Sequence, residues 1–164
     1  MSEQPQFIIE EKKRFSRSKL WDLQRNYYDQ VGANAWRRQI VPHEITSNAY
    51  IASQYARLVY AYLQDWEAQI DKDHPVYIVE LGTGSGRVSY HFIRKFLERR
   101  HRFGDLGIEF IYVMTDFTEK NINFWKSHPL VQLMLREGVA DFALFDVVND
   151  ESFTLINRGE TISA

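Results

Sequence analysis

Hydrophobic residues follow two different spacings along the chain. Helical spacing occupies the N-terminal part. Apolar residues recur every three or four positions over residues 16–31 and 47–70, which predicts two amphipathic helices. Gly32 ends the first helix, Thr46 or Ser47 can cap the second, and residues 36–44 connect them. Aromatic residues on these helices are interpreted as packing side chains that cover one face of a sheet.

Short apolar runs in the rest of the chain predict buried strands. Three such runs occur, at residues 76–79, 109–115 and 139–145. Helical spacing lies between them, at residues 87–100, 121–125 and 130–136. Strands that alternate with helices are typical of a parallel sheet in an α/β fold. A hairpin is predicted for residues 153–164, with its turn at Asn157, Arg158 and Gly159.

The composition restricts the classes of protein that fit. The 164 residues are 45% hydrophobic and 26% charged, which is typical of a globular domain. A net charge of -2 gives no indication of nucleic acid or an anionic membrane as a partner. The absence of cysteine excludes disulfides, thiolate metal sites and cysteine nucleophiles. No apolar run reaches the ~18 residues of a membrane span, and no signal peptide is recognisable, so a cytoplasmic protein is predicted.

The segment Val76–Val88, with the sequence VYIVELGTGSGRV, carries the most specific pattern in the chain. An apolar run is followed by Glu80 and then by glycine at every second position, Gly82, Gly84 and Gly86. Glycines let the backbone turn sharply and leave room for a ligand. The helix predicted after them directs free N–H groups and its positive end to the same place. A strand, a glycine turn and a helix in this order predict a nucleotide- or cofactor-binding turn.

The spacing of this motif argues against several kinds of site. Dinucleotide-binding turns have the form G-x-G-x-x-G, which disfavours an NAD(P)-dependent oxidoreductase. An ATP-binding P-loop requires Gly-Lys-Ser/Thr, whereas Arg87 and Val88 follow Gly86. Ser85 lacks the flanking residues of a hydrolase nucleophile elbow. The five histidines show no metal-ligand spacing, so no metal site is predicted and no catalytic residue is assigned.

The form E-x-G-x-G-x-G resembles motif I of the class I S-adenosylmethionine-dependent methyltransferases. The resemblance covers about residues 76–147 and implies S-adenosyl-L-methionine as the cofactor. It implies that the methionine and ribose side of the cofactor is bound by Glu80, Gly82, Thr83, Gly84, Ser85 and Gly86. Glu80 would reach the amino-acid end, directly or through water.

Asp116 follows the second predicted strand, and ligands in parallel α/β sheets lie beyond the carboxyl ends of the strands. The resemblance places the ribose-binding acid here, with Phe117 beside it, because a carboxylate can accept hydrogen bonds from both ribose hydroxyls. Asp116 comes 34 residues after Gly82, where a compact unit has ~20. Asp116 could also be the N-cap of a helix that begins near Thr118.

Asp146 and Val147 follow the third predicted strand, where the resemblance implies contacts with the adenine. The acid would bind the exocyclic amine and the next residue would contribute its backbone. Asp141, with Phe142, is the alternative if the strand register differs. Asp146 could instead open a polar turn with Asn149 and Asp150; both interpretations remain open at this point.

The resemblance also predicts the architecture, a partial Rossmann-like parallel sheet with an N-terminal helical cap and a C-terminal hairpin. Residues 1–70 would form the cap and residues 71–164 a truncated cofactor-binding domain. The family has seven strands in the order 3-2-1-4-5-7-6, of which this chain supplies the first three. N-terminal helices often close over the cofactor in that family, which draws attention to Asn48 and Tyr55.

The missing fourth strand leads to two further expectations. The apolar edge of the first strand would be exposed, so the chain is expected to be a fragment or to have this edge covered by a second copy or partner. The family's fourth strand often carries substrate-binding and catalytic groups. The leading hypothesis is therefore the cofactor-binding half of a methyltransferase whose acceptor, a protein or a small molecule, is unknown. The alternative is a non-catalytic cofactor-binding or protein-assembly module with the same fold.

Overall fold

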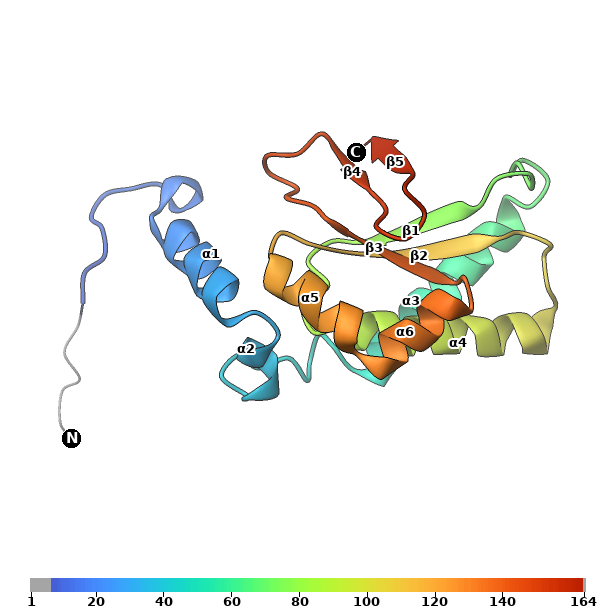
Figure 1. The fold of residues 1–164 in the computed structure, drawn as a ribbon, viewed down its shortest axis with the longest axis horizontal. Coiled ribbons are helices and arrows are strands. Elements are labelled where there is room, and N and C mark those ends of the chain that lie inside the picture. The colour runs from blue at the N-terminus through green and yellow to red at the C-terminus, as the bar shows by residue number, and fades with distance from the viewer. Residues whose placement is uncertain (1–6, 164) are drawn as a thin grey trace.

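A three-stranded parallel sheet organises the fold in the computed structural model, which describes residues 7–163 (Figure 1). The strands are β1 (Val76–Glu80), β2 (Phe110–Asp116) and β3 (Ala140–Leu144), followed by the antiparallel pair β4 (Ser152–Thr154) and β5 (Thr161–Ser163). The helices are η1 (Phe15–Arg17), α1 (Leu20–Val31), α2 (Asn34–Arg37), α3 (Ala49–Asp65), α4 (Arg87–Phe103), α5 (Glu119–Ser127) and α6 (Pro129–Arg136).

The sheet has the order β1-β2-β3, with β2 in the centre and every residue of β2 buried. Val79 lies beside Val113 in the register between β1 and β2, and Met114 lies beside Phe142 between β2 and β3. The predicted α/β fold with a parallel sheet and a C-terminal hairpin is therefore confirmed. The sheet is compatible with a Rossmann-like domain, and its order agrees with strands 1 to 3 of the implied arrangement.

Alternating residues of β2 face two different layers, as the period of a strand requires. Tyr112 and Met114 pack with helices α3 to α6 on one face, whereas Ile111 and Val113 pack with the hairpin on the other. Figure 1 shows the four helices below the sheet and β4 and β5 above it. Helix α3 shares its buried residues with the helical layer, so the division at residue 70 stays a prediction.

Asp141 fixes the hairpin to the sheet. Its carboxylate is fully buried and accepts hydrogen bonds from the Asn157 side-chain amide (2.8 Å) and from the backbone N–H groups of Asn157 (3.2 Å) and Arg158 (3.1 Å). Asp141 also lies in the first half of β3, away from the carboxyl ends of the strands. The carboxylate therefore serves the hairpin turn, and the alternative that assigned the adenine to Asp141 has no support in the fold.

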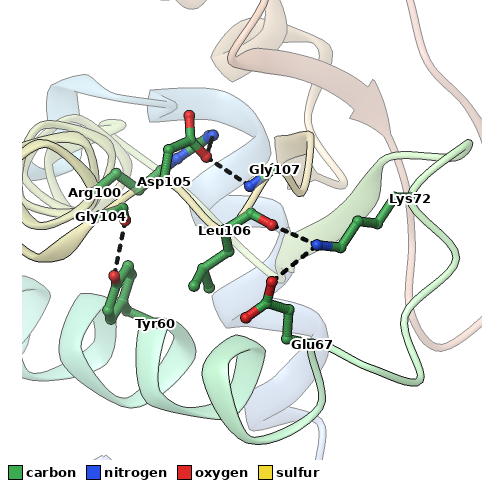
Figure 2. Close-up of polar contacts among 8 residues, drawn as sticks. All are labelled: Tyr60, Glu67, Lys72, Arg100, Gly104, Asp105, Leu106 and Gly107. Atoms are coloured by element: carbon green, nitrogen blue, oxygen red, sulfur yellow. Dashed lines mark hydrogen bonds and ion pairs between the residues drawn. The ribbon is translucent and has the colours of Figure 1, made fainter.

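Polar contacts join the helical layer to the loops at the amino-terminal ends of the strands (Figure 2). The Tyr60 hydroxyl of α3 donates to the Gly104 carbonyl at the end of α4 (2.9 Å). The Lys72 ammonium donates to the Leu106 carbonyl (2.7 Å) and pairs with Glu67 (2.9 Å). These bonds hold the end of α3 against the loop that leads into β2.

The N-terminal helices differ in part from the predicted ones. Helix α3 covers the sheet as predicted, but α1 has no buried residue, and α2 begins before the predicted connector (residues 36–44) and ends inside it. Helix α1 begins later than predicted because Ser18 is extended and the Glu10 carboxylate accepts from the Ser18 hydroxyl and the Lys19 N–H. The cap of α3 is Asn48, whose side-chain oxygen accepts from the Ile51 N–H at 2.9 Å.

Strand β1 is an edge strand in the described part of the chain, because it pairs with β2 alone. Val79 is 39% exposed there, in agreement with the expected open edge. A partner over this edge stays a prediction. Among residues 7–163, none of the helices combines the length and the apolar character that a membrane crossing needs.

Replacing Asp141 by alanine should lower the free energy of unfolding by about 3 kcal/mol, because each buried donor left without a partner costs ~1–3 kcal/mol. Urea unfolding measures this change, with Glu151→Ala as the control, since Glu151 is exposed beside the same hairpin. Equal stability of the two variants would contradict the anchoring role of Asp141.

Candidate cofactor site

The glycine loop after β1 has a backbone that favours glycine at each motif position. The φ angles of Gly82, Gly84 and Gly86 are 68°, 59° and 76°, all in the left-handed region. At Gly84 a Cβ atom would also lie 2.8 Å from the ring of Trp36, which packs directly on the loop. The motif therefore provides both the turn and the close approach of an aromatic ring.

Asp116 holds this loop against the sheet. Its side chain is 4% exposed, and its carboxylate accepts from the Gly84 N–H (3.0 Å), the Asn121 side-chain amide (2.8 Å) and the Thr118 N–H (3.1 Å). An ionised carboxylate offers about four acceptor positions, so the protein itself uses most of them. The N-cap of α5 is Thr118, which accepts from the Asn121 N–H, and not Asp116.

Two further hydrogen bonds hold the loop. The Thr83 N–H donates to the Thr115 carbonyl at 2.8 Å, and the fully buried Trp125 indole donates to the Gly84 carbonyl at 2.9 Å. With the bond from Gly84 to Asp116, the loop is attached to both β2 and α5. This loop forms one side of a cavity.

A cavity of about 290 Å³ lies at the carboxyl ends of β1, β2 and β3, and we refer to it as the strand-end cavity. It brings together four of the predicted cofactor residues, Gly82, Phe117, Asp146 and Val147. Of the others, Thr83, Gly84 and Asp116 support the loop, whereas Ser85 and Gly86 line a separate cavity on the other side of it.

Helix α1 forms the remaining wall of the strand-end cavity through Trp21, Gln24, Arg25 and Tyr28. The Arg25 guanidinium pairs with Asp146 and lies 4.5 Å from the centre of the Phe117 ring. The hydrogen bond from Arg25 is the main reason why the pKa of Asp146 is lowered. One cation thus joins the N-terminal helix to two predicted site residues.

These α1 residues were missed from the sequence, where Asn48 and Tyr55 were singled out as the cap residues. Asn48 is the cap of α3, and Tyr55 points to solvent from the same helix with 55% of its surface exposed. The cap that adjoins the cavity is α1 instead of α3, because α3 is held in the helical layer by its buried residues. The aromatic and basic residues of this helix, Trp21, Arg25 and Tyr28, were the signal available in the sequence.

Asp146 also opens a turn, as the alternative interpretation predicted. Its carboxylate accepts from the Val148 N–H (3.1 Å) and the Asn149 amide (2.6 Å), and its own N–H donates to Asp150 (2.7 Å). The turn leaves Val147 60% exposed beside the cavity. Asp146 therefore has a structural role that does not depend on a ligand.

Glu80 faces away from the strand-end cavity. It lies on the same side of β1 as Ile78, and its carboxylate accepts from the hydroxyls of Ser89 on α4 and Tyr112 on β2. Burial is the largest influence on this group and raises the pKa of the Glu80 carboxyl. The contact of Glu80 with the amino-acid end of a cofactor stays a prediction. The orientation of its side chain does not support it.

Comparisons with protein-family models, curated proteins and solved structures give no match to this chain. Within residues 7–163, no three His, Cys, Asp or Glu side chains are grouped so that they could hold a metal ion. The geometry of the site is therefore the basis for assigning a function.

The variant Glu80→Gln should abolish the part of the pH dependence of stability that comes from the Glu80 carboxyl. The folded pKa of Glu80 lies above its ordinary value of 4.5, so the folded state keeps a proton that the unfolded state releases, and stability falls as pH rises above 4.5. The glutamine oxygen can still accept from Ser89 and Tyr112.

Urea unfolding between pH 5 and pH 8 should therefore show a smaller fall for Glu80→Gln than for the native protein. Glu98→Gln is the control: the hydrogen bond from Lys95 lowers the pKa of Glu98, so this carboxyl is ionised in both the folded and the unfolded state over this range and its replacement should leave the slope unchanged. Parallel pH curves for Glu80→Gln and the native protein would contradict the assignment.

The variant Arg25→Ala should loosen α1 without unfolding the sheet. An exposed ion pair and a cation–π contact together contribute ~1 kcal/mol, so amide hydrogen exchange in α1 should rise about fivefold. Asp29→Ala is the matched control on the same helix, because Asp29 is exposed and outside the cavity. Equal exchange in both variants would show that Arg25 does not hold α1.

Proposed function

We propose that the chain binds S-adenosyl-L-methionine in the strand-end cavity and acts as the cofactor-binding part of a methyltransferase. The observation that carries this proposal is the meeting of Gly82, Phe117, Asp146 and Val147 at the ends of three neighbouring parallel strands. These residues were selected from sequence motifs, and ligands of parallel α/β sheets bind at this edge.

The residues present fit the adenosine part of this cofactor. Phe117 and Val147 offer apolar surface for an adenine ring, and Asp146 is an acceptor for its exocyclic amine alongside the bond from Arg25. The ribose would lie against Gly82 of the glycine loop, because the Asp116 carboxylate is buried and outside the cavity lining, which leaves its predicted ribose contact without support in this geometry. At about 290 Å³ the cavity is near the lower end of the ~300–1,000 Å³ range of ligand sites, so the methionine part would extend beyond it.

Methyl transfer places modest demands on the protein's own side chains. The sulfonium of S-adenosyl-L-methionine is already activated, so binding, orientation and exclusion of water supply much of the catalysis. The fixed loop and the wall formed by α1 suit that task. The methyl acceptor, a protein or a small molecule, and the catalytic residues remain unassigned.

A non-catalytic assembly module is the second candidate, and one surface favours it. Tyr55, Leu58, Tyr62 and Trp66 lie on α3 or directly after it with half or more of their surface exposed. Exposed aromatic residues of this kind are enriched at protein interfaces. Such a module would bind the cofactor without transferring its methyl group.

Calorimetric titration with S-adenosylhomocysteine, NAD and ATP tests the proposal. We expect saturable binding of S-adenosylhomocysteine alone, and binding weakened about tenfold (~1.4 kcal/mol) by Asp146→Ala. Asp146 is preferred to Asp116 for this test because Asp116 holds the glycine loop itself, whereas Asp146 holds its own turn and Arg25. Asp65→Ala, on the exposed side of α3, is the control and should bind like the native protein.

The result that overturns the proposal is the absence of S-adenosylhomocysteine binding in a protein that unfolds cooperatively. Preferential binding of NAD or ATP would assign the strand-end cavity to a different cofactor. Unchanged affinity in Asp146→Ala would remove the adenine role of that residue.

A further inference from the structure

A second cavity, of about 440 Å³, lies on the other side of the glycine loop, and we refer to it as the α4 cavity. Ser85, Gly86 and Arg87 at the start of α4 form one wall, and the α2 segment contributes Trp36 and Arg37. Phe124 of α5 and Met134 of α6 are part of the apolar side. Its size is within the ~300–1,000 Å³ range of small-molecule sites.

The first turn of α4 presents positive charge to this cavity. Gly86 is its N-cap and provides no side-chain hydrogen bond, and no acidic residue occurs in the first turn. Free N–H groups and the positive end of the helix dipole favour an anion here. Arg87, the first residue of the helix, adds a full positive charge at the end where a cation is unfavourable.

Two arginines of the α4 cavity have no carboxylate partner within residues 7–163. Neither Arg37 nor Arg87 forms an ion pair there. Arg87 contacts the Nε2 atom of His43 at 3.1 Å, and Arg37 lies 5.9 Å from the centre of the Phe124 ring. The one acid in the cavity wall, Glu44, accepts a hydrogen bond from the His43 backbone N–H.

An aromatic pair separates the α4 cavity from the strand-end cavity. Trp36 lines the α4 cavity and packs against Gly84, while Tyr28 lines the strand-end cavity. Their rings are stacked with centres 5.3 Å apart and planes at 12°. The two cavities are therefore neighbours with different linings, and they can be probed independently.

We propose that the α4 cavity binds a small organic acid. Its carboxylate would lie between Arg37, Arg87 and the first N–H groups of α4, where charge-assisted hydrogen bonds are strongest. Its apolar body would pack against Phe124 and Met134. This site does not depend on the proposed function, because none of its residues lines the strand-end cavity.

Benzoate is a suitable probe, with benzyl alcohol as its uncharged counterpart and inorganic phosphate as an anion without an apolar body. A calorimetric titration of the full chain should show that benzoate binds at least about tenfold more tightly than either of the others. Arg87→Gln and, separately, Arg37→Gln should each weaken benzoate binding about tenfold. Arg94→Gln is the matched control, because Arg94 lies on α4 but is paired with Glu98.

The indole N–H signals in NMR spectra locate the bound probe. Benzoate should shift the signal of Trp36, which lines the α4 cavity, and leave that of Trp21, which lines the strand-end cavity, unchanged. The signals are assigned by single replacement with phenylalanine. S-adenosylhomocysteine should not displace benzoate.

Several results would overturn the proposal. If benzyl alcohol bound as tightly as benzoate, the site would not recognise charge. If phosphate bound as tightly as benzoate, the site would not recognise an apolar body. Native affinity in both arginine variants, shown to be folded by cooperative unfolding, would remove the assigned residues. Displacement of benzoate by S-adenosylhomocysteine would assign the cavity to the cofactor's own carboxylate. Benzoate binding without S-adenosylhomocysteine binding would leave this site intact and reject only the proposed function.

Discussion

The buried carboxylate of Asp116 is the interaction on which the candidate site depends. It joins the glycine loop, the end of β2 and the start of α5 through hydrogen bonds to Gly84, Asn121 and Thr118. A buried carboxylate is costly unless its acceptor positions are satisfied, so these three segments must keep their relative positions. Both cavities take one wall from the loop that Asp116 holds.

Helices α1 and α3 are held by different interactions, and α1, which forms one wall of the site, is the more loosely held of the two. Helix α3 buries Ala52, Ala56, Tyr60 and Leu63 in the helical layer, whereas α1 buries no residue. Polar contacts hold α1, among them the Arg25 pair and the bond from the Lys120 ammonium to the Gln30 carbonyl (2.6 Å). Segments with few buried apolar contacts open at the lowest free energy, which suits the wall of a ligand site.

The two faces of the sheet are also closed in different ways. Helices with large aromatic contacts close one face, and a short hairpin closes the other through Phe153, Leu155 and the anchor at Asp141. The hairpin brings few residues, so the hydrogen bonds to the buried Asp141 carboxylate add to the small apolar contact in fixing its position. On the hairpin side of the sheet, Val79 of the edge strand β1 remains 39% exposed.

The sequence alone determined the α/β class, the strand-loop-helix unit at Val76–Val88 and the positions of Asp116 and Asp146 at the carboxyl ends of their strands. These features follow from local rules, namely the period of a strand, the conformational freedom of glycine and the shared carboxyl edge of parallel strands. The side of the sheet that Glu80 faces was decided by tertiary structure, since both faces of β1 pack against other elements. The same is true of the contact between Arg25 and Asp146, which lie 121 positions apart. Such contacts depend on how whole elements pack, and no spacing within one segment encodes them.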